Sequence, residues 1–311
     1  MPHEFPELSF FLDASGRFSA DKDLPIVIGG VAVATSKVDS LRESLLAVTK
    51  GGPIFKWSSA ENDVDSAKAI FRLMVKRQIT GVVTIVRKGS TEWDRYWETG
   101  QKLYEKGVTK LQEALPYAKP ATSLKFHLYG IAIGQLLGFH LFRNKHLLPK
   151  DRPQPQGLAI TAICDSDIQG ESNIQVFKRI FRELGELANT QAITNMIPKF
   201  DVRLMTEQQE PLLVLPDYLA GYVYSVDVYG REKDSARRLL IEEAQKLVDR
   251  WPNTALKITD ETFKENYLVE PHVFDRVLPK GEREQLIEEL KAQGVLPSDW
   301  KAGQDDPGRR F

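Results

Sequence analysis

Three aspartates occupy positions from which their carboxylates could meet at one metal site. Asp13 and Asp165 end short apolar segments that predict buried strands, and Asp217 opens a late helix. Carboxylates at strand ends and at a helix start can converge on one spot, and hard divalent cations prefer such oxygen ligands. Two such cations could drive an in-line displacement at phosphorus. The spacing of the three aspartates therefore indicates a site for divalent cations, Mg²⁺ or Mn²⁺, that could serve such a displacement.

Each aspartate also has a purely structural interpretation. Asp13 lies just before a Ser-Gly turn, where an aspartate can cap its own backbone. Asp217 follows Pro216 in a predicted first helical turn, where a negative charge complements the helix dipole. Asp165 and Asp167 would face the same way if their strand continued through both, and paired like charges are costly without a cation. In a loop, one of the two would instead cap a following helix.

Lys56 is the basic residue that we predict at the site. Its ammonium could contact a scissile phosphate or neutralise a carboxylate, and a solvated surface lysine is the alternative. Trp57, its neighbour, could stack on a base or pack in the core.

The composition is ordinary for a soluble protein and allows a sizeable core to form. The chain has 311 residues, of which 42% are hydrophobic and 27% charged, and its net charge is −1. A strongly basic footprint for nucleic acid is absent overall, although a local basic face is compatible with this balance. The single cysteine, Cys164, excludes an internal disulfide and suits a cytoplasmic location. The first residues include Glu4 and Glu7 and do not resemble a secretion signal.

The most apolar long segment, residues 124–142, predicts a buried helix and no membrane span. It contains Lys125, His127, Gln135 and His140, which a span of about 20 residues rarely carries. Glycines at 130, 134 and 138 would line one face of this helix and permit close packing.

The order of elements predicts a ribonuclease H-like fold. Three strands with an inserted helix precede a helical block, and strand, helix, strand and helix follow. We expect a domain over residues 1–230, with a helical insertion at about 90–145. Residues 231–311 would form a C-terminal helical extension, with a helix at about 232–250, an irregular stretch, another helix at about 281–293 and a mobile tail.

Several segments together resemble a family catalogued as domain of unknown function 3800. Phe11–Gly16 is similar to its opening F-I-D-E-S-G motif, and the strand that runs into Asp165 is similar to its central acidic strand. Leu215–Gly221 looks like its late Q-L-A-D-x-x-A-G helix start, and Phe55–Ser58 like a lysine-containing segment between them. The order and spacing of these motifs cover about residues 10–228.

The resemblance implies a ribonuclease H-like fold and metal-dependent nuclease activity, in a family found near bacterial mobile elements and defence genes. It also implies that Asp13, Asp165 and Asp217 bind the metal. Ala14 departs from the pattern, because the family motif has glutamate there. For a fourth carboxylate, Glu61 and Asp167 are both candidates, and we include Asp167 among the predicted metal ligands.

Other functions are compatible with parts of the sequence. The Asp-x-Asp at residues 165–167 also occurs in haloacid-dehalogenase-like phosphatases and glycosyltransferases, but here it lies late in the chain. A non-catalytic nucleic-acid- or protein-binding module on the same fold is the main alternative, favoured by Ala14 and by the neutral charge.

Overall fold

The computed structural model describes most of the chain between its ends. The described residues are 7–107, 109–110, 115–116, 119–144, 159–165, 199–229 and 235–263, with isolated positions at 284–285, 288, 291–292 and 298. The helix that we expected after Asp165 and the C-terminal tail lie outside these residues.

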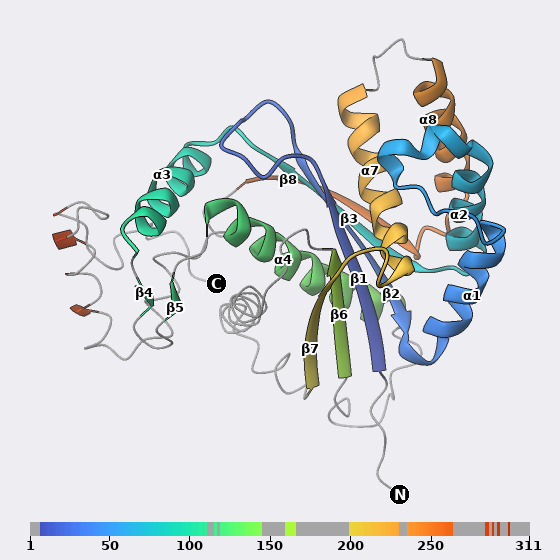
Figure 1. Ribbon diagram of the computed structural model, residues 1–311, viewed down its shortest axis with the longest axis horizontal. Coiled ribbons are helices and arrows are strands. Elements are labelled where there is room, and N and C mark those ends of the chain that lie inside the picture. Colours follow the sequence, from blue (N-terminus) through green and yellow to red (C-terminus); the bar gives the residue numbers. More distant parts are fainter. Residues whose placement is uncertain are drawn as a thin grey trace, which may run out of the picture.

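A six-stranded mixed sheet forms the centre of the fold, in the order β7-β6-β1-β2-β3-β8 (Figure 1). Strands β1 to β3 form an antiparallel meander, β6 and β7 run parallel to β1, and β8 runs parallel to β3. Their bounds are Glu7–Ser15 (β1), Ile26–Ala34 (β2), Thr80–Arg87 (β3), Ala159–Asp165 (β6), Lys199–Met205 (β7) and Leu256–Thr262 (β8). This mixed α/β arrangement confirms the predicted ribonuclease H-like fold class.

One face of the sheet is covered by α4 (Pro120–Arg143), and α3 (Thr91–Glu105) packs beside it. The apolar side of α4 is buried against side chains such as Phe10 and Leu12 of β1. The segment is thus a core helix, as predicted, and no described helix is long and apolar enough to cross a membrane.

The opposite face is covered by α7 (Val214–Tyr229), which lies across β1 and β2 (Figure 1). Around it pack α1 (Val38–Val48), the 3₁₀ helix η2 (Trp57–Asp63), α2 (Val64–Lys76) and α8 (Ser235–Val248). Asp63 caps α2, because its side chain accepts a hydrogen bond from the Ser66 amide at 3.0 Å.

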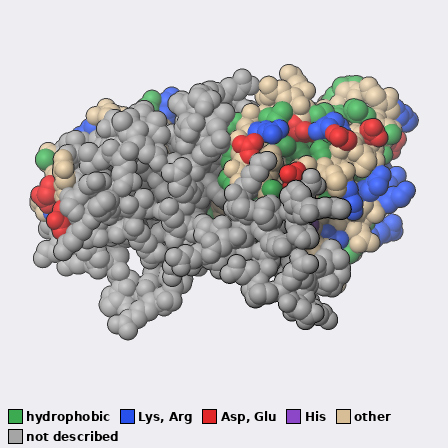
Figure 2. All heavy atoms as spheres, turned by 90° about the horizontal axis from the view of Figure 1, so that it is seen from below, with side chains coloured by type: hydrophobic (Ala, Val, Ile, Leu, Met, Phe, Trp, Pro, Cys, Tyr) green, Lys and Arg blue, Asp and Glu red, His purple; other side chains and the backbone are tan. Residues whose placement is uncertain are grey.

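Seen from below, Lys and Arg side chains gather at the end of the molecule where α1 and α2 lie (Figure 2).

Three sequence-based expectations need correction. The stretch after α8 that we expected to be irregular contains β8, which extends the sheet beyond β3. Within the helical insertion expected at about 90–145, α3 ends at Glu105, and β4 (Thr109–Lys110) pairs with β5 (Leu115–Pro116) in a short antiparallel ladder. Gly134 and Gly138 are exposed, and among the described residues an added Cβ would meet nothing within 4 Å, so they are not a packing face. The domain boundary near residue 230 stays a prediction.

Candidate metal centre

Asp13 and Asp165 lie side by side because β1 and β6 are parallel neighbours. Leu12 is the partner of Cys164 in the register, so the next residues along both strands are the two aspartates. Leu12 and Cys164 point to the α4 face, and side chains alternate along a strand, so Asp13 and Asp165 both point to the α7 face. Only 4% of Asp13 and 5% of Asp165 is exposed to solvent.

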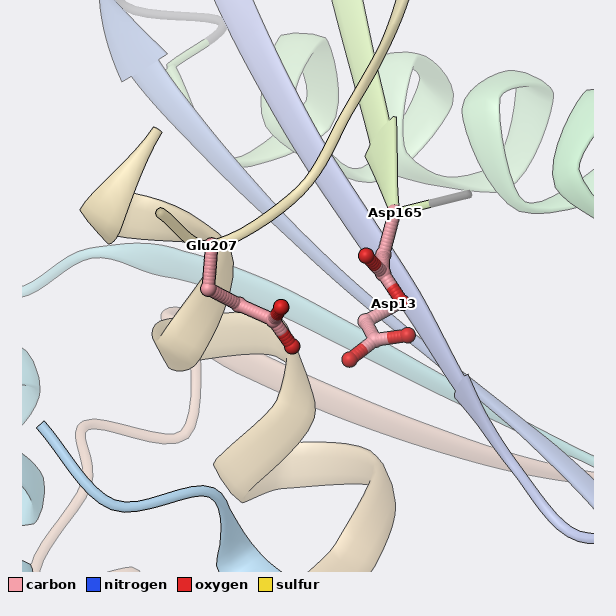
Figure 3. A group of neighbouring side chains, drawn as sticks. All are labelled: Asp13, Asp165 and Glu207. Carbon is pink, nitrogen blue, oxygen red and sulfur yellow. The ribbon is translucent and has the colours of Figure 1, made fainter. Parts of the chain in front are cut away.

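Glu207 supplies a third carboxylate that the sequence analysis missed. It lies just after β7, in the turn that leads to α7, and reaches toward the two aspartates (Figure 3). One carboxylate oxygen from each of Asp13, Asp165 and Glu207 lies within 4.8 Å of the others. Little in the sequence signals this residue, because it lies in the turn beyond β7, and that strand carries Lys199, Asp201 and Arg203 among its apolar residues.

Asp217 approaches the same place from the first turn of α7. Gly29 on β2 is the direct cross-strand partner of Asp13, and a Cβ at Gly29 would lie 2.3 Å from the Pro216 carbonyl oxygen. The missing side chain therefore lets the start of α7 lie against the sheet on the Asp13 side. Asp217 is buried there, and its Oδ2 accepts a hydrogen bond from the Trp57 amide at 2.6 Å.

The electrostatics of these carboxylates favour a bound cation. Burial raises the pKa of Asp13 well above its usual range, and the negative charges of Asp217 and Asp165 raise it further. Burial raises the pKa of Asp217 to about 6, although the Trp57 amide and the Lys56 ammonium oppose this shift. A divalent cation would remove this repulsion, and buried oxygen ligands suit Mg²⁺ or Mn²⁺, so the residues present fit the predicted metal.

Lys56 contacts the cluster through Glu207. Its ammonium forms an ion pair with the Glu207 carboxylate. Burial lowers the pKa of Lys56, but the Glu207 contact and the charges of Asp165 and Asp13 outweigh it, so the net pKa is raised. The lysine therefore carries a full positive charge at the edge of the carboxylate cluster.

The structure gives other roles to the Trp57 ring and to Glu61, which the sequence offered as site candidates. Trp57 packs in the core, edge-on to Phe71 and Tyr222, so base stacking by its ring is wrong. Glu61 forms an ion pair with Arg237 at 2.5 Å and is not part of the three-carboxylate group. Asp167 lies outside the described residues.

Ala14 occupies the α4 face of β1, opposite to Asp13. It pairs with Ile28 and packs among the apolar residues beneath α4. A glutamate side chain at this position would leave the strand on the face away from the three carboxylates. The departure from the family motif therefore removes no ligand from this cluster.

Comparison with known proteins finds solved structures whose similarity to this chain is low. No protein family profile and no curated protein matches the chain. It is similar to the ribonuclease H2 from Pyrococcus horikoshii OT3, with 12% identity and a TM-score of 0.34 over 80% of this chain and 95% of that one. It is also similar to a mutant form of Bst-RNase HIII, with 13% identity and a TM-score of 0.33 over 73% of this chain. That match spans 54% of the Bst-RNase HIII chain. A structure of Bst-RNase HIII in complex with Mn²⁺ is similar at 12% identity and a TM-score of 0.33, over 79% of this chain and 71% of that one.

Proposed function

We propose that this chain is a divalent-metal-dependent nuclease that hydrolyses phosphodiester bonds in DNA or RNA. The observation that carries the proposal is the convergence of three carboxylates within 4.8 Å, two of them buried at the ends of neighbouring parallel strands. Structural aspartates in turns are normally neutralised by backbone or basic partners. Here burial and neighbouring carboxylates raise the pKa values of Asp13 and Asp217 despite such partners, and a bound cation would stabilise their ionised forms, which supports the proposal.

The residues divide into ligands and substrate contacts. Asp13, Asp165 and Glu207 would hold Mg²⁺ or Mn²⁺, with Asp217 as a further ligand or as a base for a coordinated water. When bound, such cations activate water and stabilise the leaving oxygen in an in-line displacement. Lys56 would neutralise a non-bridging phosphate oxygen, since about half of its side chain is exposed next to Glu207.

The test is cleavage of single- and double-stranded DNA and RNA in Mg²⁺ or Mn²⁺. We expect cleavage by the wild type, none in EDTA and none by Asp13→Asn, which keeps the shape but loses the charge that a hard cation needs. Asp39→Asn is the matched control, because this carboxylate on α1 is 90% exposed. Cleavage in EDTA or by Asp13→Asn would overturn the mechanism. Mn²⁺ binding without cleavage of any substrate would favour a non-catalytic nucleic-acid-binding module.

A further inference from the structure

Arg237 on α8 holds the backbone of the segment that carries Lys56. Its guanidinium donates hydrogen bonds of 2.8 Å to the carbonyl oxygens of Trp57 and Ser58. The same group forms the ion pair with Glu61 and lies 5.7 Å above the centre of the Trp57 ring. Only 18% of the Arg237 side chain is exposed, so these contacts are shielded from water.

The segment held in this way contacts the carboxylate cluster at two points. The Trp57 amide donates to Asp217, and the Lys56 ammonium pairs with Glu207. The chain before Lys56 is irregular, since residues 53–56 belong to no helix or strand. Arg237 therefore holds the segment at Trp57, which itself contacts the site, and at the next residue, Ser58.

We propose that Arg237 is a positioning residue that sets the Lys56 ammonium and the Trp57 amide against the metal centre. The inference rests on the proposed function and extends it to α8, which lies beyond the segments that resemble the nuclease-like family. A planar guanidinium suits this task, because its fork of donors can hold two carbonyls and a carboxylate at once. A lysine at this position could satisfy only part of that set.

The first test needs no metal. Hydrogen exchange is measured for the Trp57 amide in the wild type, Arg237→Ala and Arg238→Ala. Arg238 is the matched control, because it is 69% exposed and pairs with Glu242 on its own helix. We expect exchange about tenfold faster in Arg237→Ala alone. Equal exchange in the two variants would overturn the inference. If Arg237→Ala does not fold, Arg237→Lys takes its place, with an intermediate increase expected.

The second test is a double-mutant cycle on Mn²⁺ affinity, measured by calorimetry. Lys56→Met should tighten Mn²⁺ binding about tenfold, because the ammonium no longer competes for Glu207. In the Arg237→Ala background this effect should fall below about threefold, since Lys56 is then no longer held in place. In the Arg238→Ala background it should persist in full.

The two proposals fail in different ways. An undiminished effect of Lys56→Met in Arg237→Ala would overturn the positioning role and leave the metal site intact. A wild type that binds no Mn²⁺ would overturn the proposed function, and the exchange of the Trp57 amide would still decide whether Arg237 holds the segment.

Discussion

Replacing Asp217 by asparagine should stabilise the metal-free protein. The pKa of Asp217 is about 6 in the folded protein, against 3.8 as the usual value, because burial and the charges of Glu207 and Asp165 oppose ionisation. At pH 8 both the folded and unfolded states are ionised, and the shift of roughly two units corresponds to about 3 kcal/mol of destabilisation. Asparagine removes this charge, and its side-chain oxygen can still accept the hydrogen bond from Trp57.

The destabilisation caused by ionised Asp217 depends on pH, so the stabilisation gained by Asp217→Asn must depend on pH in the same direction. A raised folded-state pKa means that the destabilisation grows as the pH rises from about 4 to 6 and is complete above 6. In EDTA at pH 8 we expect Asp217→Asn to raise the melting temperature by about 4–6 °C. The gain should fall to about half at pH 5 and vanish near pH 4. The control is Glu43→Gln, an exposed carboxylate on α1. An unchanged or lower melting temperature at pH 8, or a gain independent of pH, would refute the reasoning.

Three further variants test other parts of the account. Gly29→Ala places a Cβ 2.3 Å from the Pro216 carbonyl, so α7 must shift, and urea denaturation should show a loss of about 1–3 kcal/mol. Ala14→Glu should not improve Mn²⁺ affinity in calorimetry, because position 14 faces α4; tighter binding would contradict the assigned face. Glu207→Gln should weaken Mn²⁺ binding about tenfold or more, since a hard cation loses a charged ligand, and an unchanged affinity would exclude Glu207 from the site.

The strand ends and the helix start could be predicted because they depend on local pattern. Apolar runs that end on Asp13 and Asp165 indicate buried strands, and alternation then fixes which face the last residue takes. Pro216 before Asp217 likewise indicates a first helical turn. In the structure, antiparallel and parallel strand pairing joins these elements into the sheet of the predicted fold.

The residues that were missed depend on long-range pairing. Glu207 lies in a turn without periodicity, and its place at the site follows from the pairing of β7 with β6. The residues of β8 are mostly exposed, as expected for the last strand on one side of the sheet. Its sequence therefore contains no apolar run from which a strand could be predicted. Gly134 and Gly138 are exposed, so they gave a false packing signal, and bulky apolar residues such as Leu136 and Leu137 bury the helix instead.

The most direct test of the metal centre is an anomalous difference map from crystals soaked in Mn²⁺. We expect a peak bound by oxygens of Asp13, Asp165 and Glu207 at about 2.1 Å, the range of small hard cations. Lys56 should remain beside Glu207 or turn toward solvent. A map without a peak between these carboxylates at saturating Mn²⁺, from crystals in which all three side chains are ordered, would contradict this expectation.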